Sequence, residues 1–211
     1  MRIGAMDFSF TRIADPDRVL DEVAAAVDLE QRLTGKRESQ VQHLPYWAEV
    51  WESAAGLGQQ LLERKSDLAG KRVLDLGCGQ GLAGCVAAAL GADVLLADLE
   101  PPALLFARLN SLQSAGRVRT RQLNWQTDHL DQTFDLILGA DILYDRAQWV
   151  FLEAFWRRHL ADGGCVLLGE PGRQSGDKFL ECIESAGWNL QQFEQRVATR
   201  IKPIRIFELR S

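Results

Sequence analysis

Apolar runs and helical patterns alternate along most of this chain from residue 72 onward. Short apolar runs predict buried strands at 72–76, 94–97, 134–140 and 165–169, and a further strand is expected at 118–123. Segments with apolar residues at helical spacing follow these runs and predict helices at 82–90, 101–116, 146–160 and 174–186. Glycines end several of these helices, as the loops between helices and strands require. The pattern predicts an α/β fold, a doubly wound and mostly parallel sheet with helices on both faces.

The C-terminal part of the chain breaks this alternation. Residues 189–195 and 203–209 have the pattern of two strands joined by a short basic turn, with no helix between them. We therefore expect an antiparallel hairpin at one edge of the sheet.

The first part of the chain is expected to be an extension, residues 1–42, in front of a main domain at 43–211. Phe8, Phe10 and Arg12 suggest a short strand, and Asp15-Pro16 is a good helix start that leads to a helix ending near Leu33. This helix either covers the core or acts as a cap on the substrate side, and both interpretations stay open. The main domain begins with a dense aromatic stretch at 44–52, after which Ser53 is expected to cap a helix.

Composition and charge narrow the possible functions. The length of 211 residues suits one domain, or one domain plus a small extension, and the net charge of −5 gives no support for nucleic-acid binding. The four cysteines show no C-x-x-C spacing and the three histidines lie far apart, so we expect no metal site and no disulfide framework. No long uncharged apolar run occurs, so we expect a cytoplasmic protein that does not associate with membranes.

The stretch from Val73 to Gly81 carries the clearest chemical signal. A predicted strand leads into glycines at alternate positions and then into a helix, which brings backbone N–H groups close to a ligand. Residues 79–84 also match G-x-G-x-x-G, so a dinucleotide is the alternative ligand. Asp75 favours a cation instead, because a carboxylate repels a pyrophosphate. S-adenosylmethionine fits, since it carries an ammonium and a sulfonium group and no phosphate.

Further polar residues follow the other predicted strands at their carboxyl ends, where ligands of such sheets bind. Asp98 is expected to accept hydrogen bonds from ribose hydroxyls, Asn124 and Trp125 to flank an adenine, and Trp51 to form an aromatic wall over a cationic ligand. The predicted cofactor-binding residues are Trp51, Asp75, Gly77, Cys78, Gly79, Gly81, Asp98, Leu99, Asn124, Trp125 and Ala140.

Four sequence stretches together resemble a known family. They are Pro45-Tyr46-Trp47-Ala48 with Trp51, the run VLDLGCGQG at 73–81, the run GADILYD at 139–145, and the run LGEPGR at 168–173. The second resembles motif I of the class I, or seven-strand, S-adenosylmethionine-dependent methyltransferases. The whole set, over roughly 44–209, resembles the protein-lysine methyltransferases, including the branch that modifies the electron-transfer flavoprotein β subunit. That branch usually has Trp-Pro-Gly-Gly where this chain has Trp51-Glu52-Ser53-Ala54, so the resemblance leaves the target open.

The resemblance implies a Rossmann-like seven-strand topology, methyl transfer as the activity, and a lysine of a protein substrate as the acceptor. A lysine must lose its proton before it can attack a methyl group. We expect Asp141 and Tyr144 to bind and align the substrate amine, and Glu49, or alternatively Glu170, to help steer the cation. Tyr144 could instead be a partly buried aromatic residue at the start of a helix.

Two other functions stay open. A small-molecule N-methyltransferase could use the same core on an amine or a pyridine-type ring. A catalytically silent module could bind S-adenosylmethionine and use its surface to hold a partner. Methylation of an adenine or a glutamine amide is disfavoured because Asp141-Ile142-Leu143-Tyr144 lacks the prolines of the N/D-P-P-Y run that such enzymes usually carry.

Overall fold

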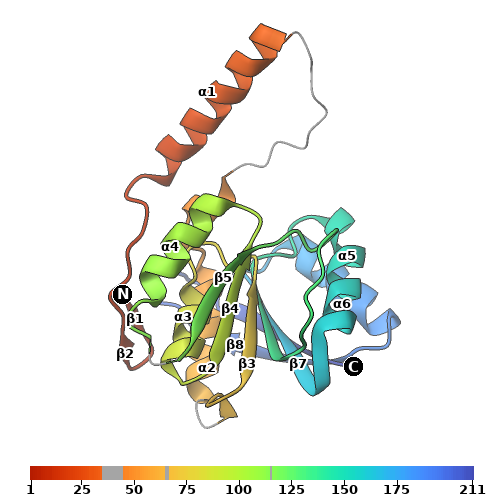
Figure 1. The fold of residues 1–211 in the computed structure, drawn as a ribbon. Helices are drawn as coiled ribbons and strands as arrows, with labels where there is room; N and C mark the ends of the chain where they lie inside the picture. The colour runs from red at the N-terminus through yellow and green to blue at the C-terminus, as the bar shows by residue number, and fades with distance from the viewer. Residues whose placement is uncertain (35–44, 65–66, 115) are drawn as a thin grey trace.

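A seven-stranded sheet forms the centre of the protein (Figure 1). The computed structural model describes residues 1–34, 45–64, 67–114 and 116–211. The strand order is β5-β4-β3-β6-β7-β9-β8, and within this sheet β9 alone runs antiparallel to its neighbours β7 and β8. The strands are β3 (Arg72–Leu76), β4 (Asp93–Asp98), β5 (Val118–Gln122), β6 (Phe134–Ala140), β7 (Leu160–Glu170), β8 (Asn189–Gln195) and β9 (Ile204–Arg210).

Helices cover both faces of this sheet (Figure 1). Val73 of β3 packs in one apolar cluster with Leu57, Val86 and other residues of α2, α3 and α4, whereas Leu74 packs in a second cluster with residues of α5 and α6. Both faces of β3 are therefore buried, which is why its sequence is an apolar run and not an alternating one. The helices are α1 (Pro16–Thr34), η1 (Tyr46–Ala48), α2 (Glu52–Glu63), α3 (Leu82–Ala89), α4 (Pro101–Ser111), η3 (Arg146–Gln148), α5 (Trp149–His159) and α6 (Gln174–Ser185).

The predicted fold class is confirmed, including the C-terminal hairpin of β8 and β9. Most predicted boundaries agree to within three residues, and two differ by five. The helix predicted at 101–116 ends at Ser111, where the hydroxyl of Ser111 donates to the carbonyl of Arg108. The last parallel strand begins at Leu160 and not at Cys165, because Leu160 pairs with Phe134 before a register shift in the β6–β7 ladder.

The predicted cap at Ser53 is wrong. Helix α2 begins at Glu52, with Trp51 as its N-cap residue, and Ser53 lies buried inside the first turn. The indole N–H of Trp51 donates to the carbonyl of Tyr46 at 2.9 Å. This bond folds residues 46–51 into a tight segment, and the helix can start only where that segment ends.

The first twelve residues pack on the body of the protein. Strands β1 (Arg2–Ile3) and β2 (Met6–Asp7) form a small hairpin, and Ile3 is buried in the same cluster as α2 and α3. The strand predicted at 8–12 is wrong, because the backbone of Thr11 pairs with the side chain of Asn110 instead of with a strand.

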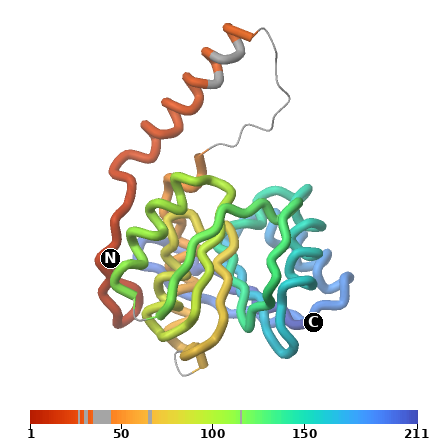
Figure 2. The backbone as a smooth tube through the Cα atoms, viewed as in Figure 1, coloured from red at the N-terminus to blue at the C-terminus, as the bar shows by residue number. Residues whose placement is uncertain are grey.

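Helix α1 projects away from the sheet and its helices (Figures 1 and 2). Asp15 accepts a hydrogen bond from the backbone of Arg18 as predicted for a capping residue. The predicted domain boundary between residues 42 and 43 lies outside the described residues. None of the helices in the described part of the chain has the length and apolar composition needed to span a bilayer.

Candidate active site

The glycine turn, residues 77–81, joins β3 to α3. Gly77, Gly79 and Gly81 all have positive φ, at 65°, 52° and 86°, a backbone region that residues with a Cβ rarely adopt. Space also requires glycine here. A Cβ at Gly77 would lie 3.0 Å from Ile142, and one at Gly81 would lie 3.0 Å from the backbone of Ala107.

The end of β4 holds this turn in place. The backbone N–H of Cys78 donates to the carbonyl of Ala97 at 3.0 Å, and that of Gly79 donates to the carboxylate of Asp98 at 2.8 Å. The second oxygen of Asp98 accepts from the backbone N–H of Glu100. Burial raises the pKa of Asp98, and these N–H donors partly oppose the rise. Asp98 thus joins the glycine turn to the neighbouring strand end, where a ribose hydroxyl could add a further bond.

Asp75 lies beneath the turn, close to α3. One of its oxygens accepts from the backbone N–H of Gly84 at 2.8 Å. The other is buried and has no hydrogen-bond partner among the described residues. Burial raises the pKa of Asp75 to about 7, against the opposing effect of the Gly84 bond, and the nearby Asp98 adds to the rise. A buried carboxylate with a free oxygen suits a cationic ligand, because the cation offsets its charge.

A cover segment, residues 46–51, lies over the glycine turn. The side-chain amide of Gln80 donates to the carbonyl of Ala48 at 2.7 Å and to that of Trp47 at 3.4 Å. The carbonyl of Gln80 in turn accepts from Asn110 of α4 at 3.0 Å. Gln80 therefore ties the cover segment, the glycine turn and α4 together.

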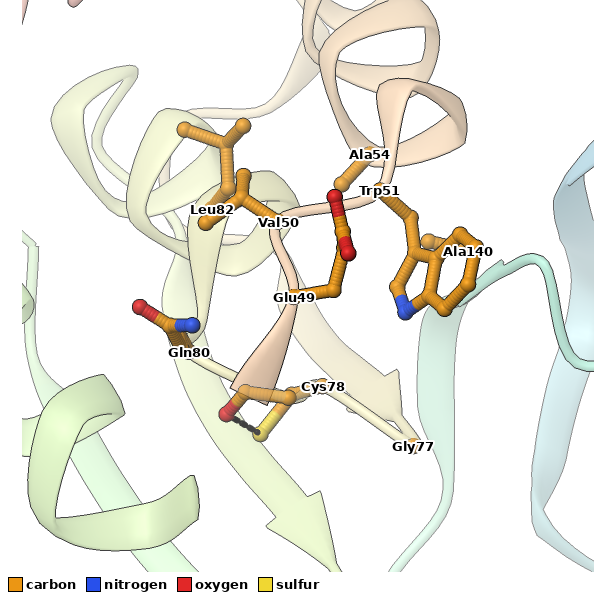
Figure 3. A pocket seen from close by; sticks show the side chains of 10 residues that line it. Glu49, Val50, Trp51, Ala54, Gly77, Cys78, Gln80, Leu82 and Ala140 are labelled. Atoms are coloured by element: carbon orange, nitrogen blue, oxygen red, sulfur yellow. Dashed lines mark hydrogen bonds between the residues drawn. The ribbon is translucent and has the colours of Figure 1, made fainter. Parts of the chain in front are cut away.

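A pocket opens between the cover segment and the glycine turn (Figure 3). Figure 3 shows the carboxylate of Glu49 and the indole of Trp51 on the same side of this pocket, with Ala140 beside the indole. Its lining residues are Glu49, Val50, Trp51, Ala54, Gly77, Cys78, Gly79, Gln80, Leu82 and Ala140. The thiol of Cys78 stays protonated here, because burial raises its pKa well above the usual range.

Trp125 reaches the glycine turn from the end of β5. Its ring would lie 3.4 Å from a Cβ at Gly77, and its indole N–H donates to Gln148 at 3.0 Å. Asn124 makes a local turn, in which its side-chain oxygen accepts from the backbone of Gln126. The carbonyl of Leu99 accepts from the side chain of Gln122. Trp125 thus presents a flat apolar surface next to the turn.

Asp141 follows β6 directly and has a φ of 53°, uncommon for a residue with a side chain. Its backbone N–H donates to the carbonyl of Gly169 at 2.9 Å, which fixes it against β7. Tyr144 lies edge-to-face with Tyr46 at 5.5 Å between ring centroids, and Tyr46 contacts Trp51 in the same manner at 6.3 Å. Tyr46, Trp51 and Tyr144 form what we call the aromatic mouth.

Arg173 pairs with Asp141 through two hydrogen bonds, of 2.9 Å and 2.7 Å. Its guanidinium also lies over the ring of Trp51, 5.7 Å from the centroid. Glu170, the alternative to Glu49 for steering the substrate cation, is buried and accepts from the backbone N–H groups of Gly172 and Arg173 and from Arg205. Glu170 therefore shapes the loop that carries Arg173.

Most of the predicted site residues gather at the carboxyl ends of β3, β4, β5 and β6, as Asp98, Trp125 and Asp141 illustrate. Two predicted residues do not line the pocket: Asp75 lies beneath the glycine turn against α3, and the open side of Gly81 is filled by α4. The sequence reasoning did not assign Gln80 or Arg173 a role. The run LGEPGR ends at Arg173, but no sequence pattern indicates that Arg173 pairs with Asp141.

The residues present fit S-adenosylmethionine. The orphaned oxygen of Asp75 suits a cation, the glycine turn leaves room for close backbone approach, and Asp98 offers a carboxylate beside it. No group of three or more His, Cys, Asp or Glu residues in the described part of the chain is arranged to hold a metal ion.

Comparisons with known proteins point in the same direction. The protein N-lysine methyltransferase METTL21A of Danio rerio is 42% identical over 131 residues, which cover 57% of this chain and 58% of that protein. The electron transfer flavoprotein beta subunit lysine methyltransferase of Danio rerio is 36% identical over 140 residues, covering 61% and 51%. The chain thus spans between 51% and 58% of the length of these two relatives.

A solved structure shows the same fold over nearly the whole chain. The magnesium protoporphyrin IX methyltransferase of Synechocystis PCC 6803 superimposes with a TM-score of 0.62 at 18% identity and covers 99% of both chains. A sequence model of the lysine methyltransferase family matches residues 37–186. That range includes the glycine turn, the aromatic mouth, Asp98, Asp141 and Arg173. The resemblance drawn from the sequence is confirmed, and the chain belongs to the lysine methyltransferase family.

Proposed function

We propose that this protein is an S-adenosylmethionine-dependent methyltransferase that modifies lysine side chains of a protein substrate. The observation that carries the proposal is the family match, because residues 37–186 contain all of the site at the carboxyl edge of the sheet. Both relatives described above are named as lysine methyltransferases of proteins.

The proposed cofactor site is the glycine turn with its surroundings. The backbone of residues 77–81 holds the methionine part, and the buried carboxylate of Asp75 offsets its positive charge from beneath the turn. Asp98 binds the ribose, and Trp125 contacts the adenine. Trp51 and Ala140 bound the same pocket. When bound, S-adenosylmethionine supplies the methyl group: the amine lone pair forms the N–C bond, the C–S bond breaks, its electrons stay on sulfur, and the methylated amine then loses a proton.

The proposed substrate site is the aromatic mouth with Asp141. Tyr46, Trp51 and Tyr144 surround a lysine side chain with apolar ring surface, which suits its four methylene groups. Asp141 accepts a hydrogen bond from the amine and aligns its lone pair. Partial desolvation of Tyr144, which is 49% exposed, raises its pKa, as do Tyr46 and Asp145, so its phenol stays neutral and can also bond the amine. Glu49, on the pocket wall, attracts the cationic side chain toward the mouth.

Incubation with methyl-labelled S-adenosylmethionine and an extract from the source organism tests this proposal. We expect label in a discrete protein band, with methyl-lysine found in it by mass spectrometry. Label confined to small molecules would instead identify a metabolite N-methyltransferase. Tight binding of the cofactor with no transfer to any component of the extract would leave a silent binding module.

Asp141→Ala provides the matched negative control. Because Asp141 is the proposed acceptor for the substrate amine, this variant should lose turnover by at least about a hundredfold. Because Asp141 contacts Arg173 and does not line the cofactor pocket, the affinity for S-adenosylmethionine, measured by calorimetry, should change by less than about threefold, which is under 1 kcal/mol. Unchanged turnover would remove Asp141 from the proposed reaction.

A further inference from the structure

The carboxylate of Asp141 does not enter the site as a lone negative charge. Arg173 holds both of its oxygens in a parallel two-bond arrangement, the strongest geometry for this pair of side chains. The side chain of Asp141 is 5% exposed and that of Arg173 is 42% exposed. The two charges therefore form one nearly neutral unit beside Trp51 of the aromatic mouth.

The position of Arg173 is built into the fold. Glu170 at the end of β7 is buried, and it fixes the backbone N–H groups of Gly172 and Arg173. Arg205 of β9 compensates the charge of Glu170. The guanidinium of Arg173 then donates hydrogen bonds to Asp141 and lies over the ring of Trp51. Three neighbouring segments thus hold it in one place.

A lone carboxylate at this position would oppose the proposed reaction. An opposite charge within about 4–6 Å favours the charged form of an amine, typically by 1–3 pKa units. An ammonium group has no lone pair, so a bare Asp141 would bind lysine tightly in a form that cannot react. A site that needs the neutral amine therefore needs a second charge nearby.

We propose that Arg173 is a positioning residue that neutralises Asp141, so that the site accepts lysine as the neutral amine and still orients it. This inference rests on the proposed function and deepens it. A carboxylate has about four lone-pair sites, of which Arg173 uses two. Asp141 can therefore accept a hydrogen bond from the amine without attracting the ammonium form.

The other charged groups around the pair do not replace Arg173. The charges of Glu170 and Arg200 act on Asp141 in addition to that of Arg173. Around the neighbouring Tyr144, Asp98 and Asp145 contribute further negative charge. Glu170 is compensated by Arg205, and Arg200 is drawn to the carbonyl of Pro171 at 2.8 Å and to Glu52 at 3.9 Å. Removal of Arg173 therefore leaves a local excess of negative charge, which retains an additional proton.

The pH dependence of turnover tests this. With saturating S-adenosylmethionine and the protein substrate recovered from the extract, the acidic limb of kcat should move upward by about one pH unit or more in Arg173→Gln. Turnover of that variant near neutral pH should fall on the order of tenfold and should recover at high pH. Arg173→Lys keeps the charge and should hold the limb near its wild-type position.

Arg117→Gln is the matched control. Arg117 pairs with Asp93 through the same two-bond geometry, at 3.2 Å and 2.7 Å. Asp93 is the first residue of β4, so this pair lies at the amino ends of the strands, away from the site. It should leave the profile unchanged. Folding of each variant is checked by circular dichroism and by its affinity for S-adenosylmethionine, which should stay within about threefold of wild type.

A second measurement separates this inference from the proposed function. Binding of n-butylamine, which has the side-chain amine of lysine, is followed by tryptophan fluorescence against pH. Arg173→Gln should bind the ammonium form more tightly than wild type does, on the order of tenfold. If wild type and Arg173→Gln give the same fluorescence titration, or the same acidic limb in the pH profile of kcat, the inference is overturned while the methyltransferase assignment stands. A wild type that labels no protein lysine overturns the assignment and the inference together.

Discussion

Asp75 combines two properties that normally exclude one another in a stable protein. It is a carboxylate that is 1% exposed, yet one of its oxygens has no partner among the described residues. An unpaired buried polar atom costs about 1–3 kcal/mol, and more if it is charged. Such a residue persists where a ligand repays the cost, which is consistent with the proposed cationic cofactor.

The raised pKa of Asp75 determines the direction in which the stability of the ligand-free protein changes with pH. Because its folded-state pKa of about 7 exceeds the unfolded value of 3.8, the folded state binds the extra proton between these two values. The free energy of unfolding should therefore fall as the pH rises from about 4 to about 8, by about 1.4 kcal/mol for each unit of the shift. Urea denaturation at several pH values measures this.

Asp75→Asn isolates the effect. The amide oxygen can still accept from Gly84, and the group no longer titrates. We expect the free energy of unfolding of this variant to depend less on pH than that of wild type, by about 4 kcal/mol across the range. The exposed Asp131→Asn serves as the control. Parallel pH curves for wild type and Asp75→Asn would show that Asp75 is ionised at little cost.

The same linkage governs cofactor affinity. If S-adenosylmethionine offsets the charge of Asp75, it binds the ionised form better, and its dissociation constant should rise as the pH falls below about 7. Asp75→Asn should bind more weakly at high pH, by at least about tenfold, and should lose this pH dependence. Calorimetry at two pH values decides between these outcomes.

At the scale of elements, the order of strands and helices could be predicted because it depends on local signals. Strands buried on both faces are apolar runs, and α3 and α6 are followed closely by Gly91 and Gly187. The placement of Asp98, Trp125 and Asp141 could be predicted in the same way, since the carboxyl ends of parallel strands lie together. Arg173 could not be assigned a role, because its pairing with Asp141 joins residues 32 positions apart in sequence. The Ser53 cap was wrong because the bond from Trp51 to Tyr46 decides where α2 starts.

Gln80 links two elements that no sequence pattern connects, the glycine turn and η1. Its amide is the donor to Ala48 and Trp47 across the pocket, and Gln80→Ala removes it. We expect the dissociation constant of S-adenosylmethionine to rise by about three- to tenfold, because the cover segment loses its attachment to the turn. Stability should fall by about 1–3 kcal/mol. Calorimetry and urea denaturation measure the two effects separately.

Gln60→Ala is the appropriate comparison for this variant. Gln60 is also a buried glutamine, and it accepts a hydrogen bond from Gln195 at 3.0 Å, away from the pocket. It should lose similar stability and keep its affinity for S-adenosylmethionine. Equal losses of affinity in both variants would mean that Gln80 acts through general stability and not through the cover segment.

At the scale of the whole molecule, the N-terminal region divides into two parts with different roles. The hairpin at residues 2–7 places Ile3 against α2, where a Cβ on Gly58 would come within 3.0 Å of it. Thr11 exchanges hydrogen bonds with Asn110, and Asn110 donates to the glycine turn at Gln80. The first twelve residues therefore support the site indirectly, whereas α1 leaves the body of the protein (Figure 2).

This division predicts opposite results for two apolar truncations in the same region. Ile3→Ala should lower the free energy of unfolding by about 2–4 kcal/mol, because Ile3 is 2% exposed and its removal leaves a cavity beside α2 and α3. Leu33→Ala on α1 should change it by less than about 0.5 kcal/mol, since Leu33 is 77% exposed. Urea denaturation of both variants, with the slope checked for two-state unfolding, measures the difference. A large loss in Leu33→Ala would show that α1 packs on the body in solution, and a negligible loss in Ile3→Ala would place the hairpin outside the cooperative unit.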